Sequence, residues 1–320
     1  MTRSMYSRLI SLIIGLSNLI ICCWAFATQL TSSEITQILR EIPQKERNNL
    51  EWFFRHAVAE DSFAYVIFGS KPMAISGYCD FSELRFHGCF QKPDEFIYSL
   101  FETCDALNLR IKNGFEAWQK YRNYFCTQKY VFKKCKNIIK NDFVCVVIVN
   151  IDLFVNTVEK HLDVFQKALG QHITPDFLLE KIERDENIFS LILKDNETLI
   201  GTLLGYGIHN ATLFHQRRKI SNKCPRSYIY LAEEKIKPLS GFSSTEKELQ
   251  YDNKKLKSFA PRKELVLNPL FMQLPVFVAD LDDPETKTLK KTYEKEQKKI
   301  LKKYKDNDFL EITLGQLTRS

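Results

Sequence analysis

The chain has 320 residues, with 46 lysines and arginines against 39 aspartates and glutamates, so its formal net charge is +7. A hydrophobic fraction of 44% with 27% charged residues is that of an ordinary globular protein. These values exclude a disordered tail protein, a collagen-like repeat and a polytopic membrane protein. The many acids also argue against a dedicated nucleic-acid-binding protein, so no nucleic-acid partner is expected.

The N-terminal segment has the three-part layout of a secretory signal. Arg3 and Arg8 form a short basic region, and Leu9–Ala27 then runs for 19 residues without a charge. The run ends in Ala25-Phe26-Ala27, a pattern of small residues that signal peptidase accepts. We therefore expect export, to the periplasm or out of the cell, with cleavage after Ala27.

Retention of this segment is the main alternative, because 19 apolar residues nearly match one membrane span. Residues 9–27 would then anchor the protein in the inner membrane. By the positive-inside rule, the rest of the chain lies outside the cytoplasm in either case. A buried N-terminal helix is the third alternative. Cleavage would remove Arg3 and Arg8 and lower the net charge from +7 to +5.

Seven of the nine cysteines follow this segment, and an odd number leaves at least one outside any intramolecular disulfide. The sequence has no C-x-x-C motif, so it indicates neither a thioredoxin-like redox pair nor a zinc ribbon. Cys145 lies in an apolar run and is expected to be a small core residue. Cys79 and Cys89 flank a polar loop and form the candidate disulfide.

The first part of the folded chain is predicted to be helical. Thr31–Glu60 predicts two helices separated at Pro43, and Thr31 or Ser32 with Glu34 a turn later forms a capping box. The second of these helices repeats apolar side chains on one face. Residues 93–125 predict a long helix that is interrupted near Asn113-Gly114.

Three short apolar runs predict a small antiparallel sheet. Phe63–Phe68 and Met73–Gly77 surround a Gly/Pro-containing turn and predict a β-hairpin. Phe143–Val149 is a continuous apolar run that suits a strand covered on both faces. Lys71 in the turn is expected to be solvated, and binding of an anion is its alternative role. The predicted fold class is therefore α+β, predominantly helical with this small sheet.

The second part of the chain returns to helix. His161–Lys219 is predicted to be helical almost throughout, with starts at Thr174-Pro175 and Asp195-Asn196. The composition then becomes polar over residues 232–262, which predicts a linker or surface arm. This arm separates a helical core domain, residues 28–231, from a C-terminal segment, residues 263–320.

The C-terminal segment contains an amphipathic helix that begins with the cap Asp283 and Pro284. Its apolar stripe consists of Leu289, Tyr293, Ile300 and Tyr304. Its opposite face consists of Lys287, Lys291, Lys295, Lys298, Lys302 and Lys305. Nine lysines and three glutamates between residues 285 and 305 give a local charge of +6. A solvated face is the simplest interpretation. The functional interpretation is that this face contacts an anionic envelope surface or an acidic partner. The candidate contact residues are Lys291, Lys295, Lys298 and Lys302.

No known catalytic signature is present: the sequence has no phosphate loop, no HExxH zinc helix and no GxSxG nucleophile elbow. The six histidines include no pair at helical ligand spacing, so no metal and no cofactor is predicted.

The most unusual segment is 199–218, which on a helix would be apolar or small on every face over most of its length. Its glycines, Gly201, Gly205 and Gly207, each cost a helix about 1 kcal/mol relative to alanine. Close approach of another helix is the preferred explanation. The alternatives are a groove floor that exposes His209 and Asn210, and a break in the helix around Tyr206.

Three segments carry a family resemblance: FAYVIFGSKPMAISGY, LIGTLLGYGIHNATLF and LPVFVADLDDPETKTLKKTYEKEQKKI. The matching positions are Phe63, Tyr65, Phe68-Gly69, Lys71-Pro72, Gly201, Leu204-Gly205-Tyr206-Gly207, Asn210-Ala211, Phe214, Pro275, Phe277, Glu285-Thr286, Leu289 and Tyr293. These segments resemble an uncharacterised family of exported proteins of Chlamydia-related and similar intracellular bacteria. The resemblance implies export and a bacterial envelope setting, and it transfers no reaction and no catalytic residue.

A non-enzymatic exported protein that binds a ligand, an unknown protein or a host partner is the leading hypothesis. An exported hydrolase with a site near Tyr206, His209 and Asn210 is the first alternative. A membrane-anchored envelope component is the second. Lys71 joins Tyr206, His209 and Asn210 as a candidate binding residue.

Overall fold

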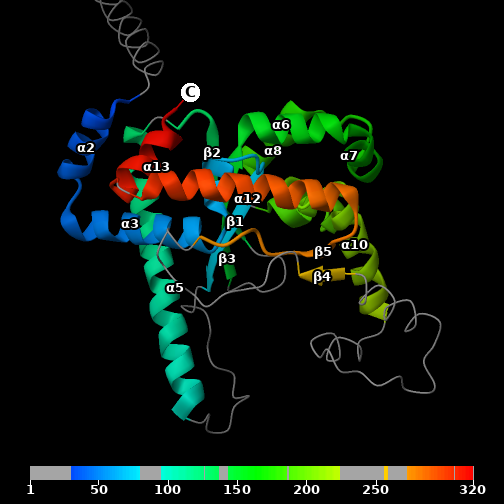
Figure 1. Ribbon diagram of the computed structural model, residues 1–320, viewed down its shortest axis with the longest axis horizontal. Helices are drawn as coiled ribbons and strands as arrows, with labels where there is room; N and C mark the ends of the chain where they lie inside the picture. The colour runs from blue at the N-terminus through cyan, green and yellow to red at the C-terminus, as the bar shows by residue number, and fades with distance from the viewer. Residues whose placement is uncertain are drawn as a thin grey trace, which may run out of the picture.

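The computed structural model describes residues 30–79, 95–125, 127–136, 143–185, 187–223, 256–258, 272–305 and 307–319. These residues form the predicted α+β fold, in which helices cover both faces of a small antiparallel sheet (Figure 1). The predicted signal, with its cleavage after Ala27 or its anchor at 9–27, lies outside the described residues. Within them, no helix has both the length and the apolar composition needed to cross a membrane.

The sheet has the strand order β1-β3-β2, with β1 at Met73–Cys79, β2 at Tyr130–Lys136 and β3 at Phe143–Asn150. Both pairings are antiparallel, and β3 lies in the centre. Successive residues of β3 point to opposite faces of the sheet and enter two different hydrophobic cores. Val146 and Ile148 belong to the first core, and Cys145, Val147 and Val149 belong to the second. The prediction of a strand covered on both faces is confirmed.

The first core lies between the sheet and helices from both ends of the described chain. These helices are α2 (Ser32–Glu41), α3 (Gln44–Ala59), α4 (Phe63–Ile67), α5 (Glu95–Tyr121), α12 (Pro284–Tyr304) and α13 (Phe309–Leu317). Edge-to-face aromatic contacts join them, for example Phe54 with Trp118 at 5.3 Å between ring centroids. The separation at Pro43 and the Thr31–Glu34 capping box are confirmed.

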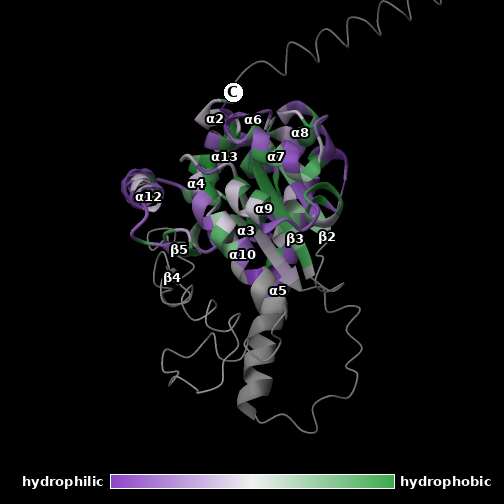
Figure 2. Cartoon of the chain, turned by 90° about the vertical axis from the view of Figure 1, so that its right-hand side faces the viewer, coloured by the Kyte–Doolittle hydropathy of each residue, from purple (hydrophilic) through white to green (hydrophobic). Residues whose placement is uncertain are grey.

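The second core lies on the opposite face of the sheet. It is covered by α6 (Ile151–Lys160), α7 (Leu162–Leu169), α8 (Pro175–Arg184), a π-helical turn at Ile188–Ile192 and α9 (Glu197–Leu203), and α10 (Ile208–Lys223) packs on α9. Thr174 and Asn196 cap α8 and α9, as predicted. Figure 2 shows hydrophobic strands at the centre and hydrophilic residues outside.

A second, two-stranded sheet pairs β4 (Leu256–Ser258) with β5 (Val278–Asp280) in antiparallel orientation. β4 falls within the polar stretch 232–262, and β5 leads directly into α12. The cap Asp283 and the buried stripe with Tyr293, Ile300 and Tyr304 are confirmed.

The predicted strand Phe63–Phe68 is wrong, because these residues form α4. Every residue from Phe63 to Ile67 is buried, and a run buried on all sides has no periodicity that separates strand from helix. The third strand is instead β2, YVFKKCK, in which three lysines obscure the pattern: Tyr130 and Phe132 enter the first core, and Cys135 enters the second.

The predicted interruption of the long helix near Asn113-Gly114 is also wrong, since α5 continues through both residues. Gly114 lies where α3 crosses α5. A Cβ at this position would lie 2.5 Å from the carbonyl oxygen of Asn49 and nearer still to Cβ of Phe53. The glycine therefore permits close helix packing.

Gly114→Ala is expected to lower the free energy of unfolding by about 1–3 kcal/mol, because the new methyl group overpacks the crossing of α3 and α5. Gly315→Ala in α13 is the matched control, since its Cβ would lie 3.4 Å from Cδ1 of Ile35, an ordinary contact. The control is expected to be neutral or to raise stability by up to about 1 kcal/mol. Urea denaturation followed by circular dichroism measures both. Equal effects of the two substitutions would contradict the packing role of Gly114.

Candidate functional site

The chain makes a sharp corner between α9 and α10. The continuous helix predicted over 199–218 is wrong, because α9 ends at Leu203 and α10 starts at Ile208. Gly205 and Gly207 have φ of +72° and +84°, a left-handed conformation that glycine adopts without steric cost. The predicted alternative, a break around Tyr206, is therefore confirmed.

Gly201 serves the predicted close approach of a second helix. A Cβ at Gly201 would lie 2.8 Å from Cβ of Ala211, so α10 folds back tightly on α9. Helix packing thus explains the glycine inside α9, while backbone conformation explains the two glycines in the corner.

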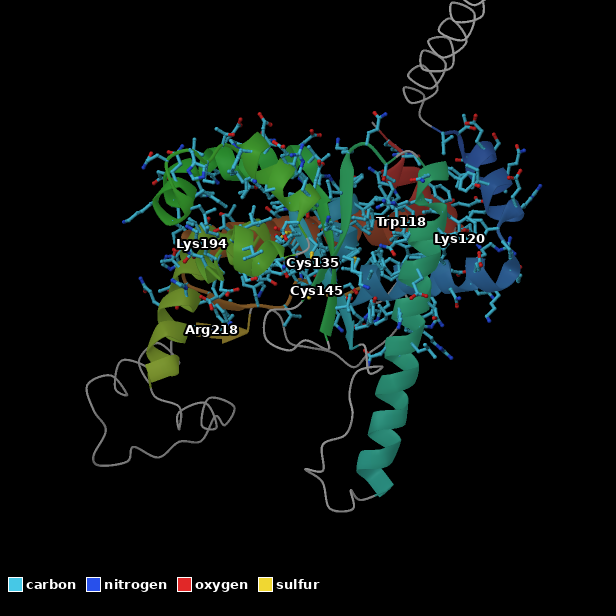
Figure 3. All side chains as sticks on the ribbon, turned by 180° about the vertical axis from the view of Figure 1, so that it is seen from behind. Trp118, Lys120, Cys135, Cys145, Lys194 and Arg218 are labelled. Carbon is cyan, nitrogen blue, oxygen red and sulfur yellow. The ribbon has the colours of Figure 1, made fainter. Side chains whose placement is uncertain are left out.

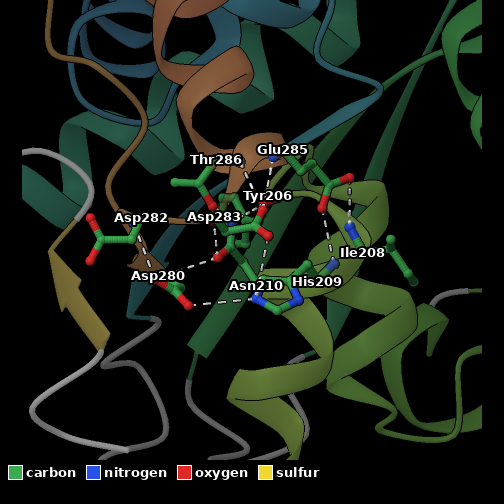
Figure 4. A network of polar contacts seen from close by, with 9 residues as sticks. All are labelled: Tyr206, Ile208, His209, Asn210, Asp280, Asp282, Asp283, Glu285 and Thr286. Carbon is green, nitrogen blue, oxygen red and sulfur yellow. Dashed lines mark hydrogen bonds and ion pairs between the residues drawn. The ribbon is translucent and has the colours of Figure 1, made fainter.

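Three side chains of α12 hold this corner from outside, together with Asn210 and Asp280. Figure 4 shows Glu285, Thr286, Asn210 and Asp280 of this group. We call Asn210, Asp280, Glu285, Thr286 and Tyr293 the corner clasp. The hydroxyl of Tyr293 donates a hydrogen bond to the Gly205 carbonyl oxygen at 2.6 Å. The Glu285 carboxylate accepts from the backbone N–H groups of Ile208 at 3.4 Å and His209 at 3.0 Å. A carboxylate at these amides also stabilises the positive end of the α10 dipole.

Asn210 is only 1% exposed, and its amide is fully engaged. Its Nδ2 donates to the Tyr206 carbonyl oxygen at 2.9 Å and to Oγ1 of Thr286 at 2.8 Å. Its Oδ1 accepts from the backbone N–H of Asp280 at 3.1 Å. An amide bonded to α12, β5 and the corner at once holds these elements together, so it has a structural role.

His209 lies on the acidic side of the clasp and does not line a cavity together with Tyr206 and Asn210. Its side chain is 39% exposed, and Nε2 lies 3.8 Å from Oδ2 of Asp280 and 3.8 Å from Oδ2 of Asp283. Within the described residues, no group of three or more histidines, cysteines or acids is arranged to hold a metal ion. The structure therefore separates His209 from its predicted partners.

Lys71 is buried, so the prediction of a solvated lysine is wrong. Its side chain runs beneath the corner, where a Cβ on Gly205 would lie 3.1 Å from Lys71 Cγ. Nζ lies 5.4 Å from the ring centroid of Tyr206, within reach of a cation–π contact. Burial lowers the pKa of Lys71 to about 7, against a smaller opposing effect of Asp61. The turn is thus covered by a corner far away in the sequence.

A cavity of about 350 Å³ lies between α9, α10 and the segment 276–278. Its lining is mostly apolar and consists of Glu197, Ile200, Gly201, Leu204, Tyr206, Asn210, Ala211, Phe214, Arg218, Val276, Phe277 and Val278. Phe214 and Val276 are 39% and 44% exposed, so large apolar side chains border the cavity. The ring of Tyr206 stacks on Phe277 at 4.3 Å between centroids.

The polar groups of this cavity are few. Glu197 accepts from Nε of Arg218 at 3.1 Å and contacts Nδ1 of His215 at 2.5 Å; Figure 3 shows Arg218 on α10, seen from behind. Burial raises the pKa of Tyr206 to about 12, so its phenol is neutral at physiological pH. The sequence did not single out Glu197 or Arg218, because their meeting depends on the turn at the corner.

A second cavity and the candidate disulfide do not add to the site at the corner. A wider cavity of about 650 Å³ at the start of β2 is lined by Trp118, Arg122, Lys133 and Glu183 among others. Of the candidate disulfide, Cys79 ends β1 and Cys89 lies outside the described residues.

Cys145 is 6% exposed, which confirms it as a core residue, and burial raises the pKa of its thiol to about 11. Lys291, Lys295, Lys298 and Lys302 all lie exposed on α12. Comparison of the chain with protein-family models, curated proteins and solved structures found no match.

The stability contribution of Lys71 is expected to depend on pH. Its pKa is about 7 in the folded protein, whereas in the unfolded chain the lysine has its ordinary pKa of 10.5. Below pH 7 the lysine is charged in both states, and the full cost of burying the charge remains, on the order of a few kcal/mol. Between these two pKa values the unfolded chain binds more protons, so the stability of the wild type rises with pH.

Lys71→Met is therefore expected to raise the free energy of unfolding most at about pH 6 and less at about pH 9. Urea denaturation at the two pH values measures the difference. Lys45→Met on the exposed face of α3 is the control and should show no such pH dependence. A gain from Lys71→Met that is equal at both pH values would contradict the burial of a titrating amine.

Proposed function

We propose that this is an exported, non-enzymatic binding protein whose cavity between α9, α10 and residues 276–278 takes a small apolar group. The observation that carries the proposal is a mostly apolar cavity of about 350 Å³ with two exposed large hydrophobic side chains, Phe214 and Val276, on it. Its volume falls in the range of about 300–1,000 Å³ typical of small-molecule sites. A ring or a short acyl chain fits this lining, and Glu197 and Arg218 offer contacts for a polar end.

Binding is favoured over hydrolysis by the chemistry of the lining. Among the described residues that line the cavity there is no serine, cysteine or histidine, and the carboxylate of Glu197 is paired with His215 and Arg218. Tyr206 keeps its proton, and the Asn210 amide is engaged by the clasp. His209 faces Asp280 and Asp283 instead.

The exported setting rests on the sequence: Arg3 and Arg8, the uncharged run Leu9–Ala27 and the family resemblance support it. N-terminal sequencing of the protein recovered from the periplasm or the medium is expected to begin at Thr28. A membrane-bound protein that begins at its original N-terminus would instead identify residues 9–27 as an anchor.

Binding to the cavity is expected to be measurable with a dansyl-labelled fatty acid, whose fluorescence rises in an apolar site. Phe214→Gln should weaken binding about tenfold or more, since an apolar ring contact contributes about 1.5–3 kcal/mol. Leu191→Gln is the matched control, because Leu191 is 64% exposed and lies away from the cavity. Absence of saturable binding, or equal loss in both variants, would refute the cavity as the site.

A further inference from the structure

The outer face of α12 is a straight row of lysines, which we call the lysine ridge. Its members share one narrow stripe of the helix, and each is exposed: Lys287, Lys291, Lys295, Lys298, Lys302 and Lys305. At 1.5 Å per residue, the ridge is about 27 Å long. Figure 2 shows α12 end-on at the edge of the molecule.

The acids of α12 do not neutralise the ridge. Glu285 caps α10, and Glu296 accepts hydrogen bonds from Ser70. Glu294 is the one glutamate of α12 on the ridge side, one turn from Lys291 and Lys298 by sequence spacing. Across the described residues, no ridge lysine takes part in an ion pair or hydrogen bond. Six positive charges, with the single negative charge of Glu294 among them, thus face an external partner.

We propose that the lysine ridge docks the protein on a membrane surface that contains anionic lipid headgroups. A headgroup layer is flat, extends beyond 27 Å and requires only flexible point charges, which lysine supplies. The ridge carries no exposed large apolar side chain, because Tyr293, Ile300 and Tyr304 are buried. Docking is therefore electrostatic, without insertion of the helix. This step rests on the export proposed above, in which the uncharged segment 9–27 brings the same chain to a bilayer.

A protein partner fits the ridge less well. The centres of protein interfaces are enriched in aromatic residues and arginine and depleted in lysine. Residues 284–305 contain no arginine, and their two tyrosines face the core. The composition thus favours a lipid surface over a folded acidic protein.

The test is sedimentation of the full chain with vesicles of phosphatidylcholine, with or without one quarter phosphatidylglycerol. Vesicles of phosphatidylcholine alone measure any binding through residues 9–27. Each lysine near an anionic surface contributes about fivefold to the partition coefficient. The variant Lys291→Gln/Lys295→Gln/Lys298→Gln/Lys302→Gln is therefore expected to lose at least about tenfold of the binding that depends on phosphatidylglycerol.

The matched control Lys45→Gln/Lys134→Gln/Lys160→Gln/Lys167→Gln removes four exposed lysines from other elements and leaves the net charge equal to that of the ridge variant. It should retain most of the binding. Equal losses of binding in both variants would refute the lysine ridge as the docking surface. Wild-type binding that is the same with and without phosphatidylglycerol would refute it as well. Ridge-dependent binding to an acidic polysaccharide but not to the vesicles would also overturn the proposal.

A different observation carries a second inference. Cys135 in β2 and Cys145 in β3 are directly opposed in the antiparallel register, and both thiols belong to the second core. Opposed residues of antiparallel strands have Cα atoms about 4.5–5.5 Å apart, within the range that a disulfide spans. Figure 3 shows the two residues side by side, and both are reduced.

We infer that Cys135 and Cys145 form a cross-strand disulfide when a low-molecular-weight disulfide acts as oxidant. One thiolate attacks oxidised glutathione and releases one glutathione. The second thiolate then attacks the mixed disulfide and releases the other, so two thiols lose two electrons and two protons in total. The chemistry needs only local opening of the sheet edge β2, and it does not depend on export.

Peptide mapping of the full chain after incubation with oxidised glutathione tests this inference. The expected product links the peptides that contain Cys135 and Cys145, and thermal unfolding should move several degrees upward. Cys135→Ser is the control and should abolish both changes. Oxidation that leaves both residues alkylatable, or that joins either one to another cysteine, would contradict the pairing.

Discussion

The hydrogen bonds from the first amides of α10 to the Glu285 carboxylate are the interaction on which the rest of the site depends. The N-terminus of a helix leaves backbone donors without intrahelical acceptors, and α10 begins directly after Gly207, which supplies no capping side chain. A residue more than seventy positions later fills that role. With Asn210, Thr286 and Tyr293, it fixes the angle at which α10 returns across α9.

The cavity and the burial of Lys71 both follow from that angle. One side of the corner, with β5 and the segment before it, borders the cavity. Gly205 of the same corner lies against the lysine stem. The helix α12 therefore has two unlike faces with separate tasks. Its inner face secures the corner by hydrogen bonds and packs on α4 through the contact of Tyr293 with Tyr65. Its outer face carries the lysine ridge.

Local signals in the sequence predicted the local structure well. The caps at Thr31, Thr174, Asn196 and Asp283 mark true helix starts, because capping is decided within four residues. The central strand was predictable from its continuous apolar run. α4 and β2 were not, because burial on all sides hides the period of α4, and lysines interrupt that of β2.

The site was only partly predictable, because local signals identify residues but not the distant residues that they contact. Tyr206 and Asn210 stand out through the glycines beside them, and Lys71 through its turn. Their actual roles depend on partners far apart in sequence, such as Glu285 for α10 and Gly205 for Lys71. The cavity residues Glu197 and Arg218 meet only after the chain has turned, and no spacing along the sequence encodes that meeting.

The measurement that tests the corner clasp most directly is residue-resolved amide hydrogen exchange of the wild type and of Asn210→Leu. The amides of residues 206–211 and of Asp280 should exchange at least about tenfold faster in the variant, since loss of a buried hydrogen bond costs about 1–3 kcal/mol. The amides of β3 should be unchanged. Unchanged exchange at the corner, or equal acceleration throughout β3, would contradict a clasp that acts locally to hold α10 in place.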